Sequence, residues 1–254
     1  RYNHRTDKYG GSLENRARFY IELMTKLKRE LGDRCAITTR FEIDTLHGPH
    51  GIEAKEDGIR FVEMMHREGI CDLWSVKIGD YEEWGEDAGA SRFRKSGWMT
   101  PFIKDAKGVL GDIPVVANGR FTSPDDMVNI LRSGVADIIG AARPSIADPF
   151  LPNKIAEGRP EDIRECIGCN MCVSKFNQVG QMQCTQNQTV MEEYRRGWHP
   201  EKFEKTNEPC SVLVVGAGPA GLECARVLGE RGYDVHLREA EAEVGGHWKW
   251  VSKL

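Results

Sequence analysis

Apolar residues recur at helical spacing within the first thirty-one positions. Steps of three and four residues run through Leu13, Ala17, Tyr20, Met24, Leu27 and Leu31. This pattern predicts an amphipathic helix with Ser12 as its N-cap and Gly32 as its end. A second helix is expected over 53–67, because Gly69 follows it.

Four short apolar runs alternate with helical segments and predict strands. They cover residues 36–41, 73–78, 114–119 and 136–140. Ser123 and Pro124 are suited to starting another helix, and a last helix is expected after Pro149. This alternation is typical of an α/β fold with a parallel sheet and right-handed crossovers. Four strands fit half of an eight-stranded barrel or part of an open sheet, and their spacing does not decide between the two.

The pattern changes twice after residue 160. Residues 161–210 are polar, rich in Cys and Gln, and show little periodicity. From Ser211 a β-branched strand, a glycine-rich turn, a helix and a second strand at 234–238 follow, which indicates a separate βαβ unit. We therefore expect three parts, with bounds 1–160, 161–210 and 211–254.

Composition narrows the possible partners. The net charge is −4 and no basic stripe stands out, which argues against nucleic acid. No apolar run approaches the ~20 residues that a bilayer-spanning helix needs, and the polar start of the chain is no secretory signal. We expect a cytoplasmic protein with no membrane partner. The sequence begins without Met and stops abruptly at Leu254, so we expect a fragment at both ends.

Four of the eight cysteines are clustered within 19 residues, with the spacing C-x2-C-x2-C-x11-C. They are Cys166, Cys169, Cys172 and Cys184. Clustered cysteines in a cytosolic enzyme favour metal binding, and four soft thiolates suit a 4Fe–4S cluster. A structural zinc site is the alternative, although such sites more often pair two distant C-x2–4-C knuckles. A set of disulfides is a third interpretation.

A glycine-rich turn follows the strand at Ser211. Gly216, Gly218 and Gly221 form G-x-G-x-x-G between a strand and a helix, and Glu239 stands 18 residues further on. In this context the motif predicts a pyrophosphate at the helix N-terminus and an acid that accepts ribose hydroxyls. An ordinary tight strand–helix turn is the alternative. The motif does not distinguish FAD, NAD and ADP.

Arginines and glycines stand where the expected strands end. They are Arg40 at the end of the first strand, Gly119 and Arg120 at the end of the third, and Gly140 and Arg143, with Ala142 between them, at the end of the fourth. Ligands of parallel α/β folds bind at the carboxyl ends of strands. Together these residues favour a phosphate-bearing cofactor, whereas singly each arginine could be a surface or salt-bridge residue.

The loop after the second strand carries an indole and two carboxylates, at Trp84, Glu86 and Asp87. An aromatic face attracts a cation and a carboxylate tunes its proton, so this loop suits an amine substrate. The alternative is a Trp that packs the loop beside solvated acids.

Several long motifs resemble one family. Residues 5–16 resemble a segment of the old yellow enzyme (NADH:flavin oxidoreductase) family, and Cys166–Cys184 with the Gly216 turn resembles its multidomain branch. Residues 84–89, 142–152 and 192–203 resemble the trimethylamine/dimethylamine dehydrogenase-like members of that branch.

The resemblance implies an architecture and an activity. Residues 1–160 would be the C-terminal half of an FMN-binding TIM (β/α)8 barrel, 161–210 the 4Fe–4S segment, and 211–254 the start of a Rossmann-like domain that binds ADP or FAD. The activity would be oxidative demethylation of a small amine, trimethylamine or dimethylamine. Electrons would pass from FMN through the cluster to electron-transferring flavoprotein, in a homodimer.

Roles are implied for single residues as well. Arg40 would contact the pyrimidine edge of the flavin, and Arg120, Ala142 and Arg143 would hold FMN and its phosphate. Trp84 would line the substrate bowl, and Asp87 would orient a catalytic histidine that lies upstream of Arg1. Phe176 stands where the branch has a bowl Trp, so the sequence leaves the choice of amine open.

Two other functions compete with amine oxidation. An NAD(P)H-dependent 2,4-dienoyl-CoA or enoate reductase would share the barrel, the cluster and the glycine turn, but the Trp84 loop does not suit its acyl substrate. An iron–sulfur carrier or zinc-stabilised module without catalysis is the third function, and the marked strand ends argue against it.

Overall fold

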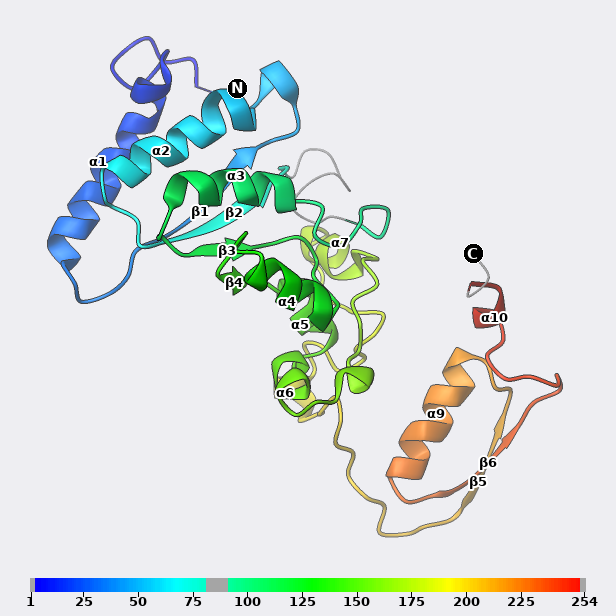
Figure 1. The fold of residues 1–254 in the computed structure, drawn as a ribbon. Helices are drawn as coiled ribbons and strands as arrows, with labels where there is room; N and C mark the ends of the chain where they lie inside the picture. The colour runs from blue at the N-terminus through cyan, green and yellow to red at the C-terminus, as the bar shows by residue number, and fades with distance from the viewer. Residues whose placement is uncertain (1–2, 81–90, 252–254) are drawn as a thin grey trace. The chain divides into compact units, whose positions relative to one another are not determined.

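The computed structural model describes residues 3–80 and 91–251, with every side chain in those ranges except that of Phe176. The chain divides into two compact units, Arg1–Gln188 and Thr189–Leu254 (Figure 1). The boundary after Gln188 falls inside the predicted middle part, 161–210. The division of the sequence into three parts remains a prediction.

The first unit contains a four-stranded parallel sheet in the order β1-β2-β3-β4. Its strands are β1 (Thr38–Asp44), β2 (Leu73–Ile78), β3 (Val115–Ala117) and β4 (Ile138–Ile139). The order along the sheet equals the order in the chain, as expected for repeated strand–helix units. The predicted α/β class and parallel sheet are therefore confirmed. The fourth strand is only two residues long, and its Ile138 is 43% exposed at the sheet edge.

Helices alternate with the strands. The longer ones in this unit are α1 (Leu13–Leu31), α2 (Ile59–Arg67), α3 (Thr100–Leu110) and α4 (Pro124–Arg132). The sequence did not predict α3. The Ser12 hydroxyl accepts a hydrogen bond from the Asn15 amide at 3.3 Å, and Gly32 ends α1 at φ 55°, so both predicted caps are confirmed. The second predicted helix begins as a π-helical turn, Ala54–Gly58, before α2.

The first unit also contains shorter helical elements between and after the strands. They are the 3-10 turns Gly48–His50 and Pro160–Asp162, and the helices α5 (Ala142–Ala147), α6 (Leu151–Ala156) and α7 (Met171–Asn177). Helix α6 is the helix expected after Pro149. Helix α7 lies within the cysteine-rich segment and contains Cys172, so this polar segment is more ordered than its lack of periodicity suggests.

The core lies between the sheet and its helices. Trp74, Val76 and Ile78 alternate along β2, and none of the three is exposed to solvent. The Trp74 ring meets the Phe61 ring of α2 edge-on, with centroids 6.4 Å apart, and Ile103 of α3 is equally buried. The intervening β2 residues point to the opposite sheet face, because side chains alternate along a strand. That face carries polar groups.

Asp72 joins three segments at the start of β2. Its carboxylate accepts hydrogen bonds from the Ile37 amide at 2.7 Å and from Lys28 Nζ at 2.8 Å, and these contacts lower its pKa.

We expect Asp72→Asn to lower the melting temperature at neutral pH. The carboxylate binds fewer protons in the folded state, so this difference should vanish as the pH falls through the lowered pKa. Melting curves at pH 7 and pH 3 test it, with the exposed Asp112→Asn as control. An equal difference at both pH values contradicts the assignment.

The second unit is a small βαβ fold. Strands β5 (Ser211–Val215) and β6 (Asp234–Arg238) pair in parallel, and α9 (Pro219–Glu230) joins them. Two short helices, α8 (Glu193–Arg196) and α10 (Trp248–Val251), complete the unit. The predicted strand–turn–helix–strand order is confirmed. In the described part of both units, no helix combines the length and apolarity that crossing a membrane requires.

Candidate functional site

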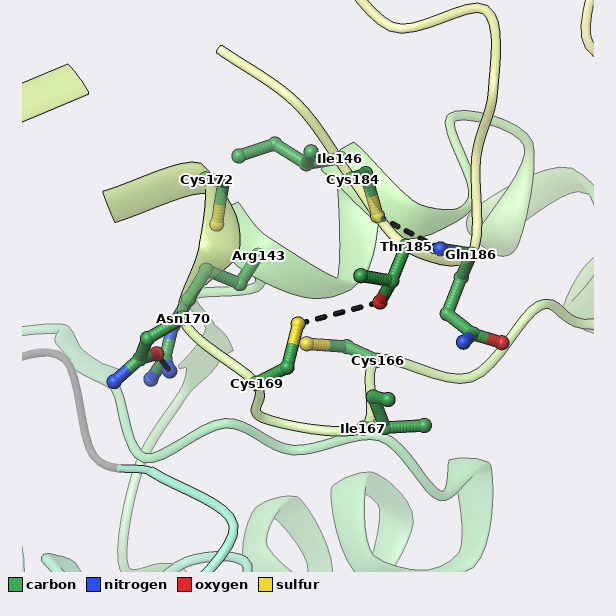
Figure 2. Close-up of a pocket in the computed structure, with 10 residues that line it drawn as sticks. All are labelled: Arg143, Ile146, Cys166, Ile167, Cys169, Asn170, Cys172, Cys184, Thr185 and Gln186. Carbon is green, nitrogen blue, oxygen red and sulfur yellow. Dashed lines mark hydrogen bonds between the residues drawn. The ribbon is translucent and has the colours of Figure 1, made fainter. Parts of the chain in front are cut away.

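The four clustered cysteines meet at one pocket in the first unit. Figure 2 shows their sulfur atoms facing a common space between α5, the start of α7 and the segment after Cys184. All four are free thiols. The other pocket residues are Arg143, Ile146, Ile167, Asn170, Thr185 and Gln186. The convergence that the spacing predicted is therefore present in the fold.

Two left-handed residues turn the chain between the first three cysteines. Gly168 has φ 69° and Asn170 has φ 57°. At Gly168 a Cβ atom would lie 2.9 Å from the Arg92 amide nitrogen, and that amide donates to the Gly168 carbonyl at 2.9 Å. Glycine is required there by both its conformation and its close approach to another backbone segment.

Two polar groups of the protein contact cysteine sulfur atoms in this pocket. The Thr185 hydroxyl lies 3.3 Å from Cys169 Sγ, and the Gln186 amide donates to Cys184 Sγ at 3.4 Å. Burial raises the pKa values of the Cys166 and Cys172 thiols, and backbone amides and nearby arginines oppose this. A bound metal removes thiol protons outright. Within the described ranges, no three His, Cys, Asp or Glu side chains are grouped closely enough to hold one metal ion.

Arg120 and Arg143, predicted to bind phosphate, both contact the segment 166–172, which carries the first three cysteines and is called the cysteine loop below. Arg143 Nη1 donates to Asn170 Oδ1 at 2.6 Å. Arg120 Nη2 donates to the Arg94 carbonyl at 2.8 Å, and its Nη1 makes a long contact of 3.5 Å to the Cys166 carbonyl. The Nε atom of Arg120 is buried and has no partner among the described residues. These arginines therefore connect the strand ends to the cysteine loop, and their phosphate role remains a prediction.

Gly119, Gly140 and Ala142 lie where the third and fourth strands end, but Arg40 does not lie at a strand end, because β1 continues to Asp44. A Cβ at Gly140 would lie 2.4 Å from Asn118 Oδ1, and a Cβ at Gly119 would lie 3.1 Å from the Gly97 Cα, so both positions favour glycine. Ala142 is the first residue of α5. Arg40 is exposed on β1, opposite Ser75 of β2 in the register.

Two polar side-chain pairs near β1 and β2 are not evident from the sequence. Lys77 Nζ lies 2.8 Å from Glu42 Oε1, and burial raises the pKa of Glu42 while Lys77 lowers it. His47 Nε2 lies 2.8 Å from Asp80 Oδ2. Glu42 and Lys77 face each other in the strand register. The signal was a charged residue directly after the first predicted strand and another inside the second.

Three predicted substrate-site features lie outside what the structure describes. Trp84 and Asp87 fall within residues 81–90, and the side chain of Phe176 is likewise outside the described part. Their assignments remain predictions.

The glycine turn of the second unit adopts the expected strand–turn–helix geometry. Gly216 has φ 97°, and a Cβ at Gly221 would lie 1.8 Å from the Gly216 carbonyl oxygen. Glu239 Oε2 accepts a hydrogen bond from the Ala217 amide at 2.6 Å, and the amides of Glu241 and Ala217 lower the pKa of Glu239. The carboxylate therefore stands beside the turn in its charged form.

Comparison with known proteins places these features in a family. Residues 1–162 match the model of the NADH:flavin oxidoreductase / NADH oxidase family, and residues 214–251 match a NAD(P)-binding Rossmann-like domain. The chain belongs to the NADH:flavin oxidoreductase / NADH oxidase family. Its fold and family therefore define an oxidoreductase of the flavin-dependent class.

The proteins similar to this chain include amine dehydrogenases and an amine oxidase. Dimethylamine dehydrogenase of Hyphomicrobium sp. (strain x) is 54% identical over all of this chain and 34% of its own length. The 6-hydroxypseudooxynicotine amine oxidase HisD from Pseudomonas geniculata N1 is 47% identical, with TM-score 0.90 over 99% of this chain and 37% of its own. Histamine dehydrogenase from Rhizobium sp. 4-9 is 50% identical, with TM-score 0.87 over 96% of this chain and 34% of its own. The chain thus spans about a third of each relative.

Proposed function

We propose that this chain is part of an iron–sulfur flavoprotein amine dehydrogenase that oxidatively demethylates a methylated amine such as dimethylamine or trimethylamine. The observation that carries the proposal is the convergence of four free thiols on one pocket beside the carboxyl ends of β3 and β4. The 54% identity to dimethylamine dehydrogenase supports the amine class.

The residues present suit a 4Fe–4S cluster better than zinc. The four cysteines share one pocket, and three of them follow one another at steps of three residues. Zinc sites with four cysteines more often pair two distant C-x2–4-C motifs. Four thiolates are the usual ligand set of a 4Fe–4S cluster. Cys166, Cys169, Cys172 and Cys184 would hold it.

The strand ends suit FMN. Arg120 keeps a buried Nε without a partner in the described part, and close packing at Gly119 and Gly140 brings backbone to the carboxyl ends of β3 and β4. Arg120, Ala142 and Arg143 would hold the phosphate, and Arg40 would neutralise charge on the ring. FMN would accept two electrons from the amine and the cluster would pass them on singly.

The substrate loop and the second unit complete the proposal. Trp84 and Phe176 would line the amine pocket, and Asp87 would orient a catalytic histidine contributed from elsewhere in the enzyme. Gly216, Gly218, Gly221 and Glu239 would bind ADP or FAD through its pyrophosphate and ribose. Four strands with an exposed edge at Ile138 support half of an eight-stranded barrel. Electron-transferring flavoprotein would accept the electrons from a homodimeric, cytoplasmic enzyme.

Anaerobic mixing of the full-length enzyme with candidate reductants tests the function. We expect dimethylamine or trimethylamine to bleach the flavin absorbance and NADPH to leave it unchanged, because the proposed pocket binds an amine. Formaldehyde should form in proportion to the amine oxidised. Bleaching by NADPH alone would instead favour a 2,4-dienoyl-CoA or enoate reductase. A colourless protein that contains zinc and no iron would contradict the cluster.

A further inference from the structure

Thr185 links two of the segments that carry the cysteines. It follows Cys184 directly in the chain, and its Oγ1 lies 3.3 Å from Sγ of Cys169, sixteen residues away. Figure 2 shows this contact as a dashed line across the pocket. Cys169 is the exposed member of the four, whereas Cys172 is buried. The hydroxyl therefore lies against the cysteine that is most open to solvent.

The direction of this hydrogen bond follows from ligation. A free thiol and a hydroxyl can each donate. A sulfur bound to iron has lost its proton and can only accept. In the cluster-bound enzyme Thr185 must therefore be the donor. The Gln186 amide already donates to Cys184 Sγ at 3.4 Å, so the same short segment supplies two donors to two ligands.

We propose that the Thr185 hydroxyl raises the reduction potential of the cluster by donating a hydrogen bond to Cys169. This proposal rests on the proposed function, because it requires the cluster. Reduction adds one electron and no proton, so the reduced cluster is more negative. A fixed donor stabilises the reduced form more than the oxidised form, and hydrogen bonds to ligand sulfur are one means by which proteins set these potentials. Thr185 is a positioning residue, and its own proton stays on Oγ1.

Three substitutions separate the hydrogen bond from the shape of the side chain. Thr185→Val keeps the volume, removes the donor and places a methyl group where the hydroxyl was, so water is also kept away. Thr185→Ala removes the donor but leaves room for water, which can replace part of the bond. Thr185→Ser keeps the hydroxyl. None of the three changes the backbone amide of Gln186.

The test is a redox titration of the full-length enzyme in which the signal of the reduced cluster is followed by electron paramagnetic resonance. At a fixed potential we expect Thr185→Val to lower the ratio of reduced to oxidised cluster about tenfold, which is about 59 mV for a one-electron couple. Thr185→Ala should give a smaller shift in the same direction. Thr185→Ser should match the wild type within about twofold.

Iron content separates the possible failures. Wild-type and Thr185→Val potentials that agree, at equal iron content, overturn the role of Thr185 and leave the cluster assignment intact. If Thr185→Val does not retain iron, the Ala and Ser variants decide, and equal potentials in these two overturn the proposal. A wild-type enzyme without iron overturns the proposed function itself.

Discussion

Lys154→Met is expected to lower the free energy of unfolding of the full-length enzyme by about 3–5 kcal/mol, the usual cost of breaking a buried ion pair from one side. Lys154 Nζ lies 2.7 Å from Asp148 Oδ2, and the two side chains are 3% and 0% exposed. Burial opposes the charge on Asp148, but Lys154 and two backbone amides lower its pKa. Removing Lys154 leaves this carboxylate charged, buried and without its cation.

The same substitution should also reduce iron content. Lys154 donates to the Asp162 carbonyl at 2.8 Å, and Asp148 accepts from the Arg164 amide at 2.9 Å. These bonds hold the segment that enters the cysteine loop two residues before Cys166. Chemical denaturation and iron analysis measure the two effects. The double variant Lys154→Met/Asp148→Asn removes both charges and should be more stable than Lys154→Met alone. Equal or lower stability of the double variant contradicts this account.

Gly221→Ala should destabilise the second unit by about 4 kcal/mol or more, at the upper end for single substitutions. A Cβ at this position would lie 1.8 Å from the Gly216 carbonyl oxygen, a backbone atom that cannot move aside alone. The turn would have to open, and α9 would lose its close approach to β5. We expect weaker protection of β5, α9 and β6 in hydrogen exchange, and loss of the nucleotide that we propose for this turn.

Gly218→Ala is the matched control for that substitution. Gly218 has φ −74°, and a Cβ there meets nothing within 4 Å. The fold should therefore tolerate alanine. If Gly218 serves to bring backbone close to a pyrophosphate, the variant should lose nucleotide while its hydrogen exchange stays at the wild-type level. Full nucleotide content in Gly218→Ala would indicate that this turn is only structural.

The sequence predicts the fold where local signals agree with tertiary packing. Helix α1 has a regular apolar period, a capping Ser12 and a closing Gly32, and all three are present in the structure. Helix α3 carries weaker signals: Pro101 in its first turn suits a helix start, but Gly108 inside it lowers its propensity. It forms because Ile103, Ala106 and Leu110 pack against the sheet, and none of them is exposed. Tertiary contact decides that element.

In the candidate site, too, the sequence predicts local features and misses contacts that depend on tertiary packing. Spacing alone predicted that the four cysteines converge, since three of them stand at steps of three residues. It did not reveal the Thr185 contact to Cys169, which joins residues sixteen apart. Nor did it reveal the Glu42–Lys77 pair, which depends on the exact register between β1 and β2. The contacts of Arg120 and Arg143 with the cysteine loop likewise depend on where that loop folds back.

The cysteine loop is hydrogen-bonded to the segment before α3 and to helix α5. The Arg92 amide binds the Gly168 carbonyl, and Arg143 binds Asn170. Electron tunnelling slows steeply with every added ångström between donor and acceptor. In the proposed enzyme, a loop held by both a main-chain and a side-chain contact would keep the gap between FMN and the cluster nearly constant during thermal motion. These hydrogen bonds would therefore make the rate of electron transfer depend on the fixed geometry of the fold and not on fluctuations of the loop.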